Sequence, residues 1–333
     1  MEFHSDKGEY FIRFGERKYC PFLNENKLCR LQFEHGEKFL SRTCATYPRI
    51  TSNFSRFFER SLILSCPVAA ELILFEREPM QFEFAEVPER IHSLGGKFLS
   101  QKIEGDDKIK EHVIEIQAAM ISILQERTLT IDQRLIVLGF FVDRLEEILL
   151  NFNGNALTKL IAAYESKKFL SEQVPLMIQS VSFDADKFVR LMHELFEKTF
   201  DEKDSPQDKK ILALIAESSL LIPDKKFFLA EYSTFLENYL VNHWFQDIYP
   251  WRFAGSLMQN FAEFVAEYKL LELIIFFATR KVSSEKKYLL ELVSLFTTRF
   301  SHTKEYRQRI FECFKDANDP FEIMGSLLEG DFK

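Results

Sequence analysis

Apolar residues recur at helical spacing from about residue 107 onward. The first stripe predicts a helix from Lys108 to Arg127, because its apolar side chains fall three or four residues apart. Thr130 followed by Gln133 has the pattern of a capping box, which predicts that the next helix begins there and runs to Leu150. The apolar positions of the first stripe are Ile109, Val113, Ile116, Met120, Ile123 and Leu124.

The same spacing continues to the end of the chain and predicts seven further helices. Asp184 is interpreted as the N-cap of one of them, and Pro223 marks a loop between two others. No repeat of fixed length is evident, so the pattern does not support a solenoid. The predicted helices are Ala156–Tyr164, Asp184–Phe200, Gln207–Leu220, Lys225–Gln246, Phe253–Ala278, Ser284–Phe300 and Lys304–Phe314.

The first hundred residues have a mixed pattern. Short alternating runs predict strands at Glu9–Phe14 and Met80–Ala85. One short helix is predicted over Leu31–Leu40, and Pro48 stops further helix because the residue before a proline is pushed away from helical angles. Pro67 is typical of a first helical turn, so another helix is expected to begin there.

These elements predict a mainly α protein with little β structure. We assign residues 1–76 to an N-terminal cysteine-rich metal or cluster module and residues 107–333 to a multi-helical domain. Residues 77–106 are interpreted as the connector, because glycines and charges interrupt the apolar pattern there.

Charge and composition argue against two classes of partner. The formal net charge is −8, which disfavours nucleic-acid binding through phosphate neutralisation. The first residues hold no apolar signal segment. The longest apolar run, Leu270–Ala278, contains Glu272 and is far shorter than the about 20 residues that cross a bilayer. We therefore expect a cytoplasmic protein that binds neither nucleic acid nor membrane.

Four of the five cysteines cluster near the start of the chain. Cys20, Cys29, Cys44 and Cys66 are separated by eight, fourteen and twenty-one residues. Clustered thiols in a reducing cytosol favour metal or cluster ligation, and four thiolates complete a zinc site or an iron–sulfur cluster. The wide spacing favours a cluster over zinc. The alternative is that some are buried structural thiols, as we expect for Cys313.

The segment from Cys20 to Leu74 resembles a known family. The runs C-P-F-L, L-C, T-C-x-x-Y-P-R and E-R-S-L-x-L-S-C-P-x-A-A-x-L-I-L are similar to the cysteine region of the flagellin lysine-N-methylases. Further along, E-N-Y-L-V-N at residues 237–242, followed by W-F and Y-P steps, is similar to a second segment of that family. Because the two blocks occur in the same order, the resemblance covers nearly the whole chain.

The resemblance implies methyl transfer from S-adenosylmethionine to surface lysines of flagellin, with an iron–sulfur cluster held by cysteines. Carried over residue by residue, it makes Cys20, Cys29, Cys44 and Cys66 the expected ligands. Related small proteins chelate zinc or iron through a similar cysteine core, so zinc is the alternative metal. The alternative function is a non-catalytic metal- or cluster-binding protein that docks onto flagellin or another protein partner.

The chain also departs from the family pattern. Family members carry a further cysteine-rich stretch, with a Cys-Cys pair, ahead of the C-P-F-L block. The printed sequence begins at Met1 without that stretch, which predicts a shortened form whose ligand set is incomplete.

Methyl transfer to an amine depends on aligning a neutral lysine with the sulfonium methyl group. The sequence contains no Gly-rich strand-to-helix turn of the usual cofactor-binding kind. Aromatic faces hold cations, so Trp244, Tyr249 and Trp251 are the candidate cofactor-binding residues, although such a cluster is more typical of a core. His243 is interpreted as a packed or capping histidine, and Glu272 as a charge on a mostly apolar helix. No catalytic residue is assigned.

Overall fold

The computed structural model describes residues 20–26, 28–54, 57–86, 97–98, 107–199, 226–252, 255–302, 304–314 and 319–330. The chain divides into two compact units, residues 1–47 with 90–94 and residues 48–89 with 95–333, and each is described by itself. The strand predicted at Glu9–Phe14 and the helix predicted at Gln207–Leu220 lie outside the described residues.

The first unit contains two short α-helices, α1 (Arg30–His35) and α2 (Arg42–Thr46), with the 3-10 turn η1 (Glu37–Phe39) between them. The single helix predicted over residues 31–40 is therefore wrong in its length. Gly36 interrupts it with a φ of 84°, a left-handed conformation that glycine adopts without a steric penalty.

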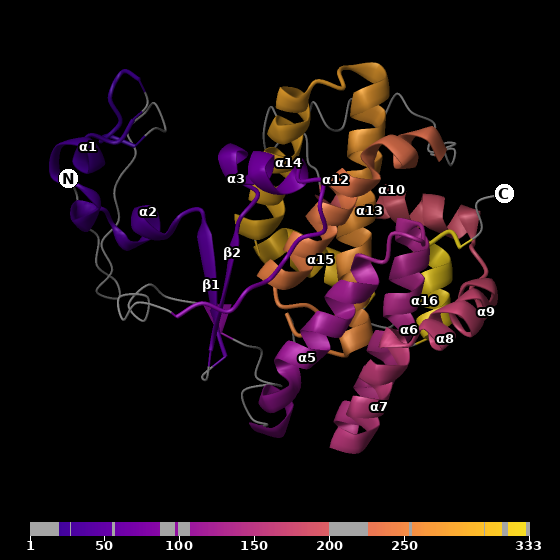
Figure 1. The fold of residues 1–333 in the computed structure, drawn as a ribbon. Helices are drawn as coiled ribbons and strands as arrows, with labels where there is room; N and C mark the ends of the chain where they lie inside the picture. Colours follow the sequence, from indigo (N-terminus) through magenta and orange to yellow (C-terminus); the bar gives the residue numbers. More distant parts are fainter. Residues whose placement is uncertain are drawn as a thin grey trace. The chain divides into compact units, whose positions relative to one another are not determined.

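A small sheet opens the second unit. Strand β1 (Arg49–Asn53) pairs antiparallel with β2 (Phe58–Leu62) and parallel with β3 (Lys97–Phe98), so the strand order is β2-β1-β3. Figure 1 shows β1 and β2 as a long hairpin. The apolar pattern did not predict these strands, because R-I-T-S-N and F-E-R-S-L carry little alternation.

The strand predicted at Met80–Ala85 is wrong, since these residues form no regular element. The segment pairs with no neighbouring strand in the described part of the chain. Side chains of the helices bind it instead. Gln125 donates a hydrogen bond to the Met80 carbonyl at 3.1 Å. The ring of Phe82 lies 4.7 Å from that of Phe245, so the apolar residues pack on helices while their backbone stays irregular.

In the second unit, the predicted helices that the structure describes are confirmed to within a few residues. The apolar pattern did not predict α8, α9 and α16. The helices of the second unit are α3 (Pro67–Leu74), α5 (Asp107–Leu124), α6 (Ile131–Leu150), α7 (Gly154–Glu165), α8 (Lys167–Glu172), α9 (Val174–Ser180), α10 (Ala185–Thr199), α12 (Lys226–Gln246), α13 (Leu257–Lys281), α14 (Lys286–His302), α15 (Lys304–Cys313) and α16 (Pro320–Leu327).

Capping side chains determine where several of these helices begin. The predicted capping box of α6 is confirmed, with the Gln133 N–H donating to Thr130 Oγ1 at 3.3 Å and the Thr130 N–H donating to Gln133 Oε1 at 3.0 Å. Asp184 caps α10 as expected, because its Oδ1 accepts the Lys187 N–H at 2.8 Å. A second capping box at Ser256 starts α13 at Leu257, later than predicted.

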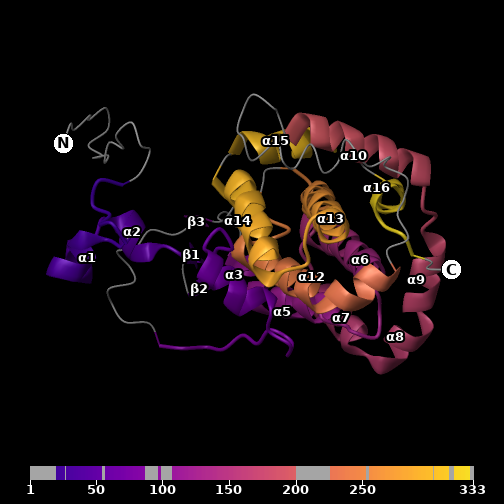
Figure 2. The ribbon, with the colours of Figure 1, turned by 90° about the horizontal axis from the view of Figure 1, so that it is seen from above.

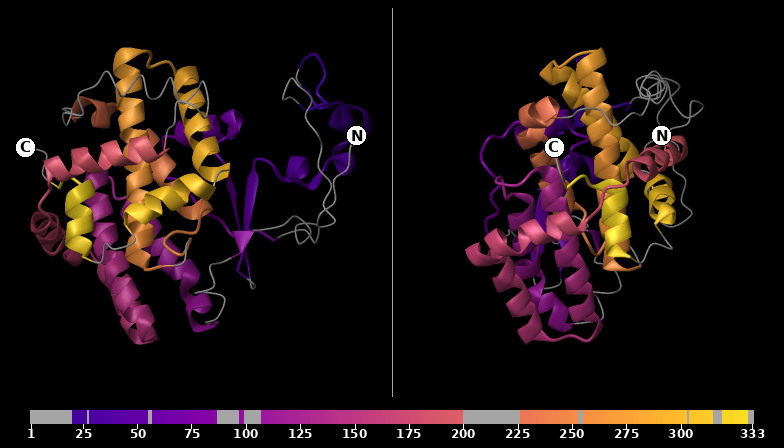
Figure 3. Two further views of the ribbon diagram at one scale, coloured as in Figure 1. Left: turned by 180° about the vertical axis from the view of Figure 1, so that it is seen from behind. Right: turned by 90° about the vertical axis from the view of Figure 1, so that its right-hand side faces the viewer.

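Helix α13 lies at the centre of the second unit. It packs against α6, α10, α12, α14, α15 and α16, and Figure 2 shows it surrounded by other helices. Every residue from 260 to 278 is buried, as is typical of a helix that is enclosed on all sides. Helix α10 crosses over α15 and α16 (Figure 3).

The sheet and α3 belong to the same unit as these helices. Strand β2 and α3 pack against α12, and α3 also packs against α14. Contacts group residues 48–89 with the helical part of the chain, and the predicted domain boundaries at residues 76 and 106 stay a prediction. Within the described residues, none of the helices combines the length and the apolar character needed to cross a membrane.

Close backbone approach at Gly325 gives a test of this packing. A Cβ atom there would lie 2.5 Å from the Ser182 carbonyl oxygen, whereas a Cβ at Gly154 would meet nothing closer than 3.9 Å. We expect Gly325→Ala to lower the free energy of unfolding by about 1–3 kcal/mol. Gly154→Ala is the matched control and should leave it unchanged or slightly raised. Denaturant unfolding measures both, and equal values for the two variants would contradict the packing at α16.

Candidate functional site

Three of the four clustered cysteines lie in the first unit. Cys20 and Cys29 flank a tight loop in which Leu23 and Cys29 pair as an isolated antiparallel bridge. Both thiols are half-buried, and Cys29 stands at the N-cap of α1. Cys44 lies in α2, where its N–H donates to Ser41 Oγ at 3.3 Å and its side chain is exposed.

Cys66 belongs to the second unit, at the N-cap of α3, and Pro67 follows it in the first turn as predicted. All four thiols are free, and thiolates are suitable ligands for zinc or iron–sulfur iron. Among the described residues, however, no three His, Cys, Asp or Glu side chains come close enough together to hold a metal ion. The ligand set stays a prediction.

Cys313, expected to be a core thiol, is half-buried and packs against the hydrophobic core. Its Sγ lies 3.4 Å from Lys198 Nζ. Burial raises the pKa of the Cys313 thiol, and the neighbouring Lys198 opposes this shift only in part.

The aromatic candidates are core residues. Trp244, Tyr249 and Trp251 are at most 2% exposed, as the alternative reading of the sequence expected. Trp244 stacks on Tyr249 with ring centroids 5.6 Å apart and meets Phe264 edge-on at 4.8 Å. A role for these rings in cofactor binding stays a prediction. None of the three borders the shallow surface depression that residues of α3 and α14 line.

A buried charged network adjoins these rings. The imidazole of His243 lies between two carboxylates, with Nδ1 3.1 Å from Asp247 Oδ2 and Nε2 3.2 Å from Glu267 Oε1. Arg252 pairs with the other oxygen of Asp247. We call these four residues, together with Glu263 and the tyrosines Tyr239 and Tyr249, the His243 network.

The tyrosines connect the rest of the His243 network. The Tyr239 hydroxyl donates to Glu267 Oε1 at 3.4 Å, and the Tyr249 hydroxyl donates to Glu263 Oε2. Burial, reinforced by the neighbouring carboxylates, raises the pKa of both phenols, so both remain protonated. They serve here as fixed hydrogen-bond donors.

Charge within the His243 network balances only if one carboxyl group is neutral. Burial disfavours the His243 cation, but Glu267 and Asp247 outweigh that effect and raise its pKa to about 9. Burial and the nearby Glu267 raise the pKa of Glu263 to about 8. Near neutral pH, protonated His243 and Arg252 therefore lie beside the Asp247 and Glu267 side chains, while Glu263 keeps its proton.

The turn after α12 carries several members of the His243 network. Ile248 adopts a φ of 59°, which is uncommon for a β-branched residue and strains the backbone. The following Tyr249–Pro250 peptide bond is cis. Asp247 and Tyr249, on either side of Ile248, both point their polar atoms into the network.

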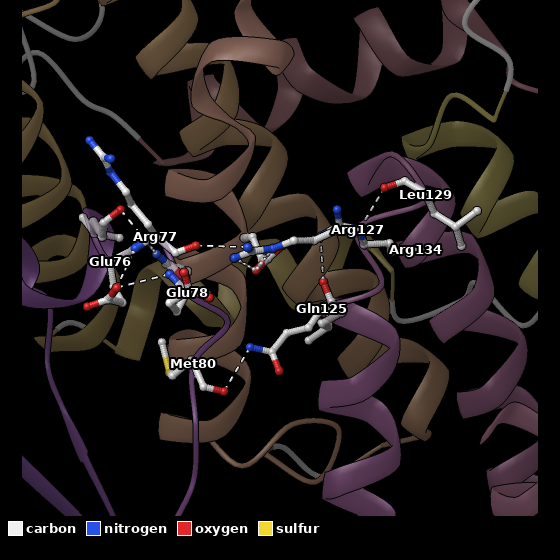
Figure 4. A network of polar contacts seen from close by, with 12 residues as sticks. Glu76, Arg77, Glu78, Met80, Gln125, Arg127, Leu129 and Arg134 are labelled. Atoms are coloured by element: carbon white, nitrogen blue, oxygen red, sulfur yellow. Dashed lines mark hydrogen bonds and ion pairs between the residues drawn. The ribbon is translucent and has the colours of Figure 1, made fainter.

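A second buried ion cluster lies on the same helix. Glu237 accepts from Arg134 Nη1 at 2.7 Å and from Arg127 Nη2 at 2.8 Å. Arg127 also donates to the Arg77 carbonyl at 3.0 Å, which ties the irregular segment after α3 to the end of α5 (Figure 4). Glu237 is the first residue of the E-N-Y-L-V-N run.

The asparagines of that run bind the cysteine region. Asn238 Nδ2 donates to the Glu76 carbonyl at 2.8 Å, just after α3. Asn242 Nδ2 donates to the Leu62 carbonyl at 3.2 Å, at the end of β2. The two sequence blocks that carry the family resemblance therefore meet in the folded protein.

A third buried cluster surrounds Lys269. Its Nζ pairs with Asp132 of α6 and lies 3.3 Å from Glu272 Oε2 on its own helix. The Tyr268 hydroxyl also donates to Glu272, at 3.3 Å. Glu272, interpreted as a charge on an apolar helix, is thus a fully buried partner in an ion cluster.

The sequence analysis did not single out Asp247, Glu263 or Glu267. The available signal was the run of charged residues in α13, two to four positions apart within an otherwise apolar helix, since buried charges need partners. Perturbed pKa values in a cluster mark candidates for proton transfer. The His243 network is nevertheless closed to solvent, so its role in this structure is to hold α12, its following turn and α13 together.

Comparisons with known proteins relate the chain to a family of lysine N-methylases. The family model described as the FliB lysine N-methylase C-terminal domain matches residues 117–328. A 61-residue segment, 18% of this chain, is 39% identical to the flagellar biosynthetic protein FliU of Salmonella muenchen, covering 36% of that protein. It is equally similar to a lysine-N-methylase of Salmonella typhimurium, covering 15% of that protein. No solved structure gives a significant match.

The described residues of the second unit define a helical protein with a small three-stranded sheet and charged clusters in its core. Since the family model spans most of this unit, the chain belongs to the FliB lysine N-methylase family. The matched segment covers only a minor part of the length of the curated relatives. The resemblance found in the two sequence blocks is thereby confirmed.

The protonation of Glu263 predicts a pH dependence of stability. Folded Glu263 keeps its proton up to about pH 8, whereas its ordinary pKa is 4.5, so the folded state binds the extra proton between these values and stability falls as pH rises. Glu263→Gln has no proton to lose. Between about pH 5 and pH 8 the wild type should therefore lose about 3–4 kcal/mol of stability relative to Glu263→Gln.

Denaturant unfolding at the two pH values measures this relative loss. Glu147→Gln, an exposed position on α6, is the control and should follow the wild type at both. Burial also raises the pKa of Glu59 to about 8. Because Glu59 titrates in the wild type and in Glu263→Gln alike, its effect cancels when their free energies of unfolding are subtracted. A constant difference between Glu263→Gln and wild type would show that Glu263 is ionised throughout.

Proposed function

We propose that this chain is part of a protein-lysine N-methyltransferase that uses S-adenosylmethionine and acts on flagellin. The observation that carries the proposal is the match of residues 117–328 to the lysine N-methylase domain. The two family blocks support it, because the side chains of Asn238 and Asn242 in the second block donate hydrogen bonds to the backbone carbonyls of Glu76 and Leu62, after and within the first. In this proposal the enzyme works in the cytoplasm, where thiols stay reduced.

The four clustered cysteines are the proposed metal ligands. We propose that Cys20, Cys29, Cys44 and Cys66 contribute to an iron–sulfur cluster, with zinc as the alternative. Trp244, Tyr249 and Trp251 do not fit an exchangeable cofactor in the present arrangement, since their rings are closed inside the core. The proposal therefore assigns no residue to the sulfonium.

The first experiment is methyl transfer by the full-length protein. After anaerobic reconstitution, we expect S-adenosylmethionine to methylate flagellin lysines, detected by mass spectrometry, and S-adenosylhomocysteine to give no product. A protein that binds flagellin stably but transfers no methyl group would overturn the enzyme proposal. That result would support the alternative of a non-catalytic metal- or cluster-binding protein that docks onto flagellin.

The cluster has its own test. We expect anaerobically purified protein to contain stoichiometric iron and sulfide and to absorb visible light, because thiolate-bound clusters are coloured. Cys29→Ser and Cys44→Ser should lose iron and lower the melting temperature, since ligand binding and folding are coupled. Cys313→Ser is the matched control and should keep its iron. A colourless protein with stoichiometric zinc would reject the cluster.

A further inference from the structure

Helix α3 presents an apolar face to solvent. Ala69, Ala70 and Leu74 are buried against the unit, yet Val68 and Leu72 on the opposite side are each 66% exposed. These two residues are one helical turn apart, so their side chains are adjacent on the surface. A helix that is apolar on both sides at the surface of a protein marks an interaction site.

The exposed face of α3 borders a depression of about 290 Å³, which we call the α3 groove. Helix α14 supplies one wall through Lys286, and the other lining residues follow one another along α3 and just beyond it. This volume suits one long side chain rather than a nucleotide cofactor. The groove is lined by Val68, Glu71, Leu72, Phe75, Glu76 and Lys286.

An ammonium group already occupies part of the α3 groove. Lys286 Nζ lies 4.5 Å from the centroid of the Phe75 ring and 2.9 Å from Glu71 Oε1. An aromatic face combined with a carboxylate is the arrangement that holds alkylammonium ions. The position of Lys286 thus indicates that the groove suits an alkylammonium group.

The groove also carries a negative charge that Lys286 does not balance. Glu76 Oε1 accepts the Arg77 N–H at 2.7 Å and the Glu78 N–H at 3.2 Å. The hydrogen bonds from Glu78 and Arg77 lower the pKa of the Glu76 carboxyl group and fix its position. Two carboxylates therefore face one ammonium among the lining residues, so the charge favours a further cation.

We propose that the α3 groove binds a lysine side chain of a protein partner, with the methylene stem on Val68 and Leu72 and the ammonium at Phe75, Glu71 and Glu76. In the free protein Lys286 fills the ammonium position and is displaced when the partner binds. That the partner is the methylation substrate rests on the proposed function. The apolar wall and the negative charge together select lysine over acidic or purely apolar side chains.

Binding of a small lysine probe tests the groove directly. N-acetyl-lysine methylamide is titrated into the full chain and followed by NMR or calorimetry. Lys286→Met keeps the methylene stem and removes the competing ammonium, so the probe should bind about fivefold tighter than to wild type. Adding Glu71→Gln to that variant should weaken binding about fivefold. Leu72→Ser should also weaken it, because the stem loses its apolar wall.

The controls separate the groove from general charge effects. Lys187→Met removes an exposed lysine from another Lys–Glu pair, with Glu322 at 2.6 Å, and should not change probe affinity. The matching norleucine amide lacks the ammonium and should bind more weakly than the lysine probe. Equal binding of the two probes, or an equal gain from Lys187→Met, would overturn the proposal.

Different results would overturn the groove proposal and the proposed function. Probe binding with no methyl transfer would support the groove and remove its role in catalysis. Methyl transfer to flagellin with unchanged KM in Glu71→Gln and Leu72→Ser, together with no probe binding, would overturn the groove and leave the enzyme. If both proposals hold, these variants raise KM for flagellin and leave KM for S-adenosylmethionine unchanged.

Discussion

Charge buried inside the helical unit constrains the rest of its structure. Helix α13 carries Glu263, Glu267, Lys269 and Glu272 at positions that solvent does not reach. Removing a charge from water costs several kcal/mol unless a partner compensates for it. Each of these residues therefore needs an opposite charge, a proton or a hydrogen-bond donor from a neighbouring element. The arrangement of α6, α12 and the turn after α12 supplies them.

Helix α12 also fixes the position of β2 and of the residues after α3. Helix α12 contacts α13 through His243, and its Asn238 and Asn242 side chains contact the residues after α3 and the end of β2. Breaking a buried pair leaves an unpaired charge, which is far costlier than losing an exposed pair. Helix α12 thus links the charged core to the backbone of β2 and of the residues after α3. Glu76, whose carbonyl accepts one of these hydrogen bonds, also lines the α3 groove.

Local signals predicted most of the helices, whereas tertiary partners were hidden from the sequence. The capping box at Thr130 and the first-turn Pro67 could be read directly because their contacts are made within a few residues. Strands β1 and β2 pair with each other over five residues but were missed, because their sequences alternate little between apolar and polar side chains. His243 was correctly expected to be packed, but its partners Asp247 and Glu267 depend on the turn and on α13.

The hydrogen bonds of α12 constrain the order in which the chain can fold during synthesis. Asn238 and the Leu74 and Glu76 carbonyls are 164 and 162 residues apart, and Asn242 lies 180 residues from Leu62. The ribosome makes about 5–20 residues per second, so β2 and α3 leave it many seconds before their partners exist. During that interval the apolar surfaces of α3 have no helix to cover them. A chaperone that shields this segment until residue 242 has emerged would protect the nascent chain from aggregation.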